Sequence, residues 1–337
     1  MIVTLQLLGG LVLLVGGADL LVRGAARLAR MLGLSPFAIG VTVVAFGTSA
    51  PELFASANAA WQGAGDLAVG NVVGSNIANV LLILGLTAAL SPFRVERGVL
   101  RSGIPVMIGV TLVASPMLGM GDRALGRVEG GFLVAGLVAY IVHSYIDGRK
   151  NPDSLAHDFE REVTDELHLD RPEPRSRLWI DLTLIVAGLA GLTLGSDLLV
   201  AGATVLATDV LGVSAGVVGL TVVAFGTSLP ELAASVRACL GREHAMAMGN
   251  VIGSNVFNLL CVLGFSSLLA PVYARDGIET DLLIMIASAM LCFPLLAFAR
   301  LAPQRTVGRA QGVLMVLLYA GYTAYVFADE KGALPAG

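Results

Sequence analysis

A twelve-residue segment of this chain occurs twice with a single substitution. Residues 42–53 read TVVAFGTSAPEL and residues 221–232 read TVVAFGTSLPEL, so 11 of 12 positions are identical. Each copy places a glutamate, Glu52 or Glu231, inside a long apolar stretch. A carboxylate in a membrane-spanning segment is energetically costly and is by default a functional residue. The repeat therefore predicts a function for both glutamates.

Composition assigns these apolar stretches to a lipid bilayer. Of the 337 residues, 56% are hydrophobic and 14% are charged, and the mean hydropathy is +0.82. A soluble domain carries about one-quarter charged residues. The three cysteines lie in apolar segments and lack the spacing of a zinc site. No basic residue precedes the first apolar stretch, so we expect a retained span there rather than a cleaved signal peptide.

Ten apolar stretches are long enough to be membrane spans, five before and five after a polar segment at 147–177. They cover residues 2–30, 35–62, 66–90, 103–119, 124–146, 178–208, 214–240, 245–270, 280–300 and 308–328. We therefore predict an all-α integral membrane protein with ten transmembrane helices. Its parts are a first five-helix repeat (1–146), a linker (147–177) and a second five-helix repeat (178–337).

The distribution of basic residues predicts the orientation of the chain. Of the 21 Lys and Arg residues, only Arg123, Arg127, Arg275 and Lys331 fall on the side of the predicted spans opposite the linker, which leaves 17 on the linker side. Because basic loops remain in the cytoplasm, we expect a cytoplasmic linker and both termini outside, in the cell (inner) membrane. The linker is too short to form a folded regulatory domain.

The repeat extends well beyond the twelve-residue segment. Residues 40–79 and 219–258 align without a gap and share 23 of 40 residues, within motifs that we place at 40–80 and 219–259. An odd number of spans in each half predicts inverted repeats, in which broken helices meet at a midplane substrate site. A duplication that preserves only helix packing would fit the 41 glycines. Packing alone, however, does not require Glu, Asn, Thr and Ser at matched depth.

Each repeat contains the residues of a helix break. Pro51 cannot donate a backbone hydrogen bond, and Gly47 tolerates unusual backbone angles. We expect Ser49 or Thr48 to cap the restarted helix. The break is also expected to free carbonyl oxygens around Ala45 and Thr48, which a bound cation would satisfy. The second copy has the same features at Ala224, Gly226, Thr227, Ser228 and Pro230.

Oxygen-bearing side chains recur every four residues around each break, which places them on one face of a helix. The stripes are Thr48, Glu52 and Ser56 with Asn71, Ser75 and Asn79, and in the second half Thr227, Glu231 and Ser235 with Asn250, Ser254 and Asn258. Coordination by oxygen alone suits Ca²⁺ and Na⁺ and disfavours zinc or copper. One divalent ion, or several monovalent ions, would neutralise the two carboxylates, so the two kinds of ion would compete.

The paired GTSxPE and GNxxGSN motifs resemble those of the cation/calcium exchanger superfamily, and within it the prokaryotic sodium/calcium exchangers. The resemblance covers nearly the whole chain. It implies an electrogenic antiporter that expels Ca²⁺ against several Na⁺ by alternating access, with no cofactor and no nucleic-acid partner, working as a monomer in the bilayer. It also implies that the first and sixth spans slide across the other helices.

The resemblance also implies roles for individual residues, all of them ligands of the transported ions. Glu52 and Glu231 would bind Ca²⁺ with Thr48 and Thr227; Ser75 and Ser254, with the carbonyls of Ala45 and Ala224, would complete flanking sodium sites; and Ser49, Ser228, Asn79 and Asn258 would line the central position.

Other functions remain open from the sequence. Potassium-dependent relatives carry Asp at the position of Asn258, and proton/calcium relatives carry Glu at the positions of Gly74 and Gly253, so both departures favour sodium. A passive cation channel would use similar ligands but needs a continuous pore. An intramembrane enzyme using Glu52 and Glu231 as acid and base would need a nucleophile or a metal motif, and neither is found in the sequence. We therefore expect a transporter and not an enzyme.

Overall fold

The first half of the chain folds almost entirely into helices. The computed structural model describes residues 2–95, 99–119, 124–150, 178–206, 224–275, 277–301 and 306–330. The helices of the first half are α1 (Ile2–Leu32), α2 (Pro36–Ile39), π-helical η1 (Gly40–Val44), α3 (Ala45–Thr48), α4 (Ala50–Trp61), α5 (Gly65–Ala78), π-helical η2 (Asn79–Leu84), α6 (Gly85–Leu90), π-helical η3 (Val99–Gly103), α7 (Ile104–Gly119) and α8 (Arg127–Lys150).

The second half repeats this order of helices. Its elements are α10 (Leu178–Val205), α12 (Ala224–Thr227), α13 (Leu229–Leu240), α14 (His244–Phe257), π-helical η7 (Asn258–Val262), α15 (Leu263–Leu269), α16 (Ile278–Leu301) and α17 (Arg309–Glu330). Two short antiparallel sheets join the halves: β1 (Phe93–Arg94) pairs with β4 (Thr306–Val307), and β2 (Ala124–Leu125) pairs with β3 (Val272–Tyr273).

The prediction of a multi-pass helical membrane protein is confirmed. Seven described helical segments are long and apolar enough to cross a membrane, and a bent pair, Pro36–Thr48 with Ala50–Trp61, makes an eighth. The count of ten spans and the inverted relation of the halves stay predictions. Residues 207–223, which include the start of the predicted span 214–240, lie outside the described residues, as do 151–177 of the linker.

Helix α8 extends beyond the apolar stretch predicted at 124–146. It continues to Lys150, into the predicted linker 147–177, whose bounds stay a prediction. Residues 147–150 are Asp, Gly, Arg and Lys, so the last turn of the helix is not apolar. Basic side chains are favourable at a helix C-terminus, and a helix end that leaves the hydrocarbon region needs no apolar residues. Hydropathy therefore marks the end of the apolar segment rather than the end of the helix.

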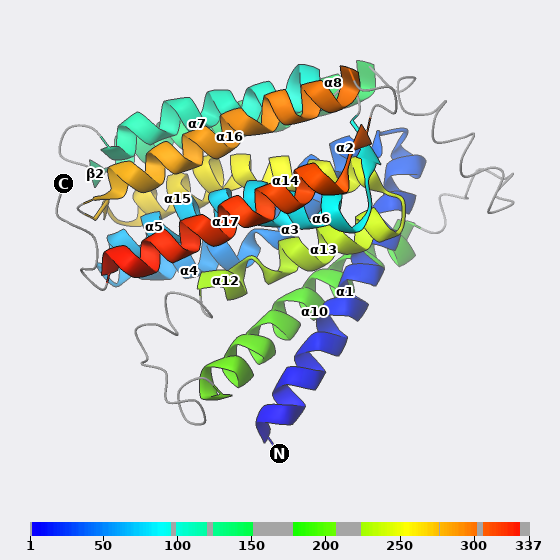
Figure 1. Ribbon diagram of the computed structural model, residues 1–337, viewed down its shortest axis with the longest axis horizontal. Coiled ribbons are helices and arrows are strands. Elements are labelled where there is room, and N and C mark those ends of the chain that lie inside the picture. Colours follow the sequence, from blue (N-terminus) through cyan, green and yellow to red (C-terminus); the bar gives the residue numbers. More distant parts are fainter. Residues whose placement is uncertain are drawn as a thin grey trace, which may run out of the picture.

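Helices α1 and α10 form a pair that runs diagonally to the other helices (Figure 1). Their glycines allow the two backbones to touch. A Cβ atom on Gly17 would lie 2.7 Å from the backbone nitrogen of Leu192, and one on Gly188 would lie 2.6 Å from the backbone nitrogen of Leu21. In a membrane, where apolar surface gains little by leaving lipid, such close packing of small residues supplies much of the association energy between helices.

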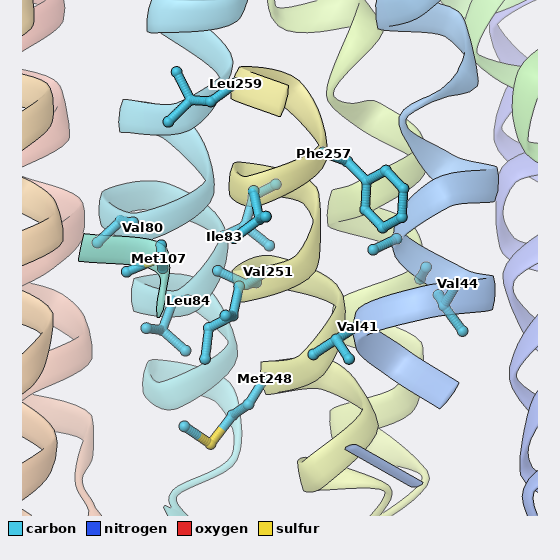
Figure 2. Packing of buried hydrophobic residues seen from close by; sticks show 14 of the residues in the cluster. Val41, Val44, Val80, Ile83, Leu84, Met107, Met248, Val251, Phe257 and Leu259 are labelled. Atoms are coloured by element: carbon cyan, nitrogen blue, oxygen red, sulfur yellow. The ribbon is translucent and has the colours of Figure 1, made fainter. Parts of the chain in front are cut away.

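The segments that carry the Asn and Ser stripes lie at the centre of the bundle. Within an 18-residue apolar stretch of the segment Gly65–Leu90, 78% of the residues are buried inside the protein, and in the corresponding stretch of His244–Leu269 the share is 89%. The corresponding share in α1 is 33%. Figure 2 shows the hydrophobic packing around this centre, where Val251 of α14 belongs to the same buried cluster as Val41 of η1 and Ile83 of η2. These two segments are therefore surrounded by protein rather than lipid.

An ion pair ties α1 to the rest of the bundle. Arg23 Nε lies 2.8 Å from Asp19 Oδ2 on the same helix. Arg237 Nε of α13 donates to Asp19 Oδ1 at 2.9 Å. A pairing of Asp19 with Arg23 is expected from their spacing of four residues, but the contact with Arg237 was not predicted because the residues are 218 apart in sequence. Asp19 therefore has an interfacial role.

The contact between α1 and α10 yields a prediction about stability. Gly17→Val places three carbon atoms where the backbone of α10 now lies, and we expect it to destabilise the protein by about 1–3 kcal/mol, the usual cost of overpacking. Gly16→Val is the matched control, since a Cβ at Gly16 meets no other heavy atom within 4 Å. Thermal unfolding of the detergent-purified variants measures both effects. Equal melting temperatures for the two variants would contradict the packing described.

Candidate cation-binding site

Both helix breaks occur where the sequence predicts them. The helix Pro36–Thr48 and α4 meet at an angle of 44°, with Ser49 between them and Pro51 in the first turn of α4. In the second half, Ser228 separates α12 from α13 in the same way, and its backbone angles (φ −88°, ψ 3°) match those of Ser49 (φ −82°, ψ 5°). The two breaks are therefore copies of one local structure.

Two expectations about the breaks are wrong in detail. Neither Ser49 nor Ser228 makes a capping hydrogen bond from its side chain. The Ala45 carbonyl is not left without a donor, because it accepts the Ser49 backbone N–H at 3.0 Å; the Thr48 hydroxyl oxygen lies 3.4 Å from the same carbonyl oxygen. The bend is mild enough for the backbone to keep this hydrogen bond. Because they cap no helix, the serine hydroxyls remain available for contacts across the site.

The two glutamates lie fully buried, and each contacts the serine of the opposite break. Ser49 Oγ donates to Glu231 Oε1 at 3.0 Å, and Ser228 Oγ lies 3.5 Å from Glu52 Oε1. The exposed fraction of both glutamates is 0%. These contacts join residues 182 and 176 positions apart in sequence. The predicted grouping of each glutamate with residues of its own half is thus incomplete, because the nearest hydroxyl comes from the other half.

The break threonines also bond across the halves. Thr48 Oγ1 donates to Asn250 Oδ1 at 3.1 Å, and Thr227 Oγ1 donates to Asn71 Oδ1 at 3.2 Å. Each asparagine also makes a hydrogen bond within its own half: Asn71 Nδ2 donates to Ser56 Oγ at 3.0 Å, and Asn250 Nδ2 donates to Ser235 Oγ at 2.9 Å. The asparagines therefore join the two breaks into one unit.

The predicted serines of α5 and α14 lie beside the same glutamates. Ser75 Oγ is 3.1 Å from Ser228 Oγ, which places it next to the hydroxyl that faces Glu52. Ser254 is completely buried on α14. Ala45 is also fully buried, and Ala224 begins α12. The structure thus places Ser75 next to the Glu52–Ser228 contact and buries Ser254 and Ala45.

A cluster of four asparagines extends the site. Asn79 Nδ2 donates to Asn255 Oδ1 at 3.2 Å, and Asn258 Nδ2 donates to Asn76 Oδ1 at 3.2 Å. All four side chains are at most 2% exposed. Asn76 and Asn255 were not predicted as site residues, because they fall off the four-residue stripes. Their identity in both copies of the GSN motif was the available signal.

Two elements at this position depart from ordinary α-helix. Segment η2 begins at Asn79 and η7 begins at Asn258, so the same π-helical distortion occurs at matched residues in both halves. Short π-helical segments inside α-helices are frequent at functional sites. The distortion begins at the last residue of each stripe, Asn79 or Asn258, and it could not be predicted from periodicity.

The site presents oxygen acceptors that lack a donor. Glu52 Oε2, Glu231 Oε2, Asn79 Oδ1 and Asn258 Oδ1 are buried and receive no hydrogen bond from the described residues. Leaving such atoms unpaired costs about 1–3 kcal/mol each, and more for a charged group. A cation would satisfy all four. Because every one of these atoms is an oxygen, a hard ion such as Ca²⁺ or Na⁺ fits them.

Fold and site together define a multi-pass membrane protein with a buried, all-oxygen cluster shared between two sequence repeats. The family model described as "Sodium/calcium exchanger protein" matches residues 2–146 and 180–328. The chain therefore belongs to the sodium/calcium exchanger family, within the cation/calcium exchanger superfamily.

Individual relatives agree with this placement. The chain is 40% identical over 332 residues to "Putative antiporter CaxA" of Alkalimonas amylolytica, covering 98% of this chain and 100% of that protein. It is 39% identical to "Inner membrane protein YrbG" of Escherichia coli over 84% of each chain. A solved structure of the sodium-calcium exchanger NCX_Mj, soaked with zero Na⁺ and Ca²⁺, matches 96% of this chain and 99% of its own with a TM-score of 0.79 and 31% identity.

The bridging role of Asn250 yields a prediction. Asn250→Ala removes the acceptor of Thr48 Oγ1 and the donor to Ser235 Oγ inside a region without solvent. We expect a loss of stability on the order of 3 kcal/mol, because buried partners are left unpaired. The matched control is Asn58→Ala, since Asn58 is exposed and bonds only to Gln62 among the printed contacts of the described chain. A melting temperature as high as that of the control would contradict the bridging role.

Proposed function

We propose that this protein exchanges Ca²⁺ for several Na⁺ across the membrane by alternating access, in the direction of Ca²⁺ extrusion. The observation that carries the proposal is the matched pair of fully buried carboxylates, Glu52 and Glu231, each facing a serine of the opposite repeat. Two negative charges of this kind repel each other and are strongly disfavoured in a membrane unless cations accompany them. One Ca²⁺ and several Na⁺ are alternative ways to supply that charge.

The proposed ligand roles are those that the resemblance to the exchanger family implies. Glu52 and Glu231 bind Ca²⁺, assisted by the hydroxyls of Thr48 and Thr227. The central position is lined by the amide oxygens of Asn79 and Asn258, which have no other donor among the described residues, together with the hydroxyls of Ser49 and Ser228. Flanking sodium ions bind at Ser75 with the Ala45 carbonyl and at Ser254 with the Ala224 carbonyl.

The choice of Na⁺ over H⁺ as the coupling ion is supported by the packing at Gly253. A Cβ atom at this position would lie 2.6 Å from the Ala45 Cβ and 2.7 Å from the Val41 Cα. A glutamate like that of proton-coupled relatives therefore has no room at Gly253, whereas a Cβ at the matched Gly74 would meet no other heavy atom within 4 Å, so packing excludes the glutamate only in the second repeat. Asn258 is neutral where potassium-dependent relatives carry a carboxylate. The packing at Gly253 and the neutral side chain of Asn258 favour an exchanger driven by sodium alone, and the exchange is electrogenic when more than two Na⁺ enter for each Ca²⁺ expelled.

Burial favours alternating access over a passive channel. Both glutamates have no exposed surface, and Asn76, Asn79, Asn250, Asn255 and Asn258 are at most 2% exposed, whereas Asn71 and Thr227 are only partly buried. The described residues therefore enclose the two carboxylates themselves, as alternating access requires. A channel needs a continuous pore. The site consists only of ligands, so transport and not catalysis is the proposed activity, without a cofactor. Since both repeats of one chain complete the site, a monomer suffices.

The proposed topology places the site at the bilayer midplane. Two five-helix repeats, 1–146 and 178–337, cross the membrane in opposite directions, with the linker 147–177 in the cytoplasm and both termini outside. The odd number of predicted spans per half and the excess of basic residues on the linker side support this arrangement. The name of the Escherichia coli relative supports location in the inner membrane.

Substitution of either glutamate tests the proposal. Glu52→Gln and Glu231→Gln keep the side-chain size but remove one charge, so we expect each to abolish sodium-driven Ca²⁺ uptake into proteoliposomes. Glu129→Gln is the matched control, since Glu129 accepts from the Gly126 backbone at the start of α8, away from the site. Imposing Na⁺, H⁺ and K⁺ gradients separately identifies the coupling ion. Uptake that survives in Glu52→Gln, or that follows a proton gradient alone, would overturn the proposal.

A further inference from the structure

We propose that Asn76 and Asn255 are positioning residues that turn the amide oxygens of Asn258 and Asn79 toward the transported cation. Each acts within a chain of three side chains that begins at a methionine. The two chains, which we call amide relays, are Met107–Asn255–Asn79 and Met285–Asn76–Asn258. This inference deepens the proposed exchange function and rests on it.

The first contact of each relay fixes the amide orientation of the asparagine next to the methionine, Asn255 or Asn76, which we call the outer asparagine; Asn79 and Asn258 are the inner asparagines. Asn255 Nδ2 lies 3.3 Å from Met107 Sδ, and Asn76 Nδ2 lies 3.7 Å from Met285 Sδ. A thioether sulfur accepts hydrogen bonds weakly and donates none, whereas an amide has a donor end and an acceptor end. The sulfur therefore attracts the amide nitrogen and not the amide oxygen. Asn76 Nδ2 has a second acceptor, the Asn255 carbonyl at 3.4 Å, which favours the same orientation.

The second step passes this orientation to the inner asparagine. With its nitrogen toward the sulfur, the outer asparagine directs its oxygen inward, where it accepts from Asn79 Nδ2 in one relay and from Asn258 Nδ2 in the other, both at 3.2 Å. The inner nitrogen is then occupied. The inner oxygen remains, and in both relays it is a buried acceptor without a donor among the described residues.

Burial stabilises the amide orientation of the relay asparagines. All six side chains are at most 2% exposed, so water does not compete for the amide groups. In such surroundings hydrogen bonds are strong and a reversed amide would leave several groups unpaired. Reversal of Asn79 or Asn258 would also point an NH₂ group, which repels cations, into the site. The relays therefore hold two neutral ligands ready before an ion arrives.

Each relay crosses between the halves twice. Met107 and Asn79 belong to the first half, while Asn255 between them belongs to the second; Met285, Asn76 and Asn258 show the reverse. Each methionine lies nine residues before the proline inside its helix, Pro116 in α7 or Pro294 in α16, so the two methionines occupy matched positions of the repeat. The outer asparagine of one half thus serves the ion ligand of the other half. This crossing distinguishes a positioning role from a general contribution to stability.

Double-mutant cycles on the full-length purified protein test the crossing. The readout is the dissociation constant for Ca²⁺, measured by isothermal titration calorimetry in detergent at fixed Na⁺. We expect Asn76→Leu to weaken Ca²⁺ binding by roughly three- to tenfold, the size of one hydrogen-bond contribution. In an Asn258→Ala background it should have no further effect, because the residue through which it acts is gone. In an Asn79→Ala background it should keep its full effect. For Asn255→Leu the backgrounds exchange roles: it should have no further effect with Asn79→Ala and its full effect with Asn258→Ala.

Methionine variants guard against loss of folding in the asparagine variants. Met107→Leu and Met285→Leu nearly conserve volume and remove only the sulfur acceptor, so they should fold and weaken Ca²⁺ binding by roughly twofold. The relays would be overturned if Asn76→Leu raised the dissociation constant for Ca²⁺ equally in both alanine backgrounds, or if its effect vanished with Asn79→Ala instead of Asn258→Ala. A wild-type protein that binds no Ca²⁺ would overturn the proposed function as well, whereas wild-type binding with additive cycles would overturn the relays alone.

Discussion

The rest of this structure depends on the cost of holding two carboxylates inside a membrane bundle. Glu52 and Glu231 are completely buried, and each has one oxygen that no described residue satisfies. Each charge at such a depth costs on the order of 3 kcal/mol even on lenient scales. The protein does not offset this cost with Lys or Arg at the described site. It surrounds the carboxylates with neutral acceptors, so that mobile cations must supply the balancing charge.

The surrounding fold serves this arrangement. The segments Gly65–Leu90 and His244–Leu269 occupy the bundle centre and carry the neutral oxygens away from lipid. Glycines allow α14 to approach the helix before the first break closely, since a Cβ on Gly253 would lie 2.6 Å from the Ala45 Cβ. Helices α1 and α10 pack closely against each other at their glycines, and the ion pair between Asp19 and Arg237 joins α1 to α13.

Sequence reasoning found much of this arrangement because the repeat carries the chemistry twice. Hydropathy located the helices, Gly47 and Pro51 located the break, and four-residue spacing identified Glu52, Ser75 and Asn79 with their counterparts. It missed contacts that depend on how the halves face each other. Nothing in the local pattern shows that Ser49 bonds to Glu231 instead of capping α4, or that Asn76 and Asn255 meet the inner asparagines. The π-helical segments that begin at Asn79 and Asn258 could not be predicted from periodicity either.

The central claim is that the two repeats build one cation site between them. Equilibrium binding of radioactive Ca²⁺ to the purified protein tests it most directly. The account predicts one Ca²⁺ per chain, displaced by Na⁺ with a concentration dependence steeper than one-to-one, and lost completely when either Glu52 or Glu231 is changed to Gln. Two Ca²⁺ per chain, with one retained after loss of either glutamate, would show two independent sites and contradict it.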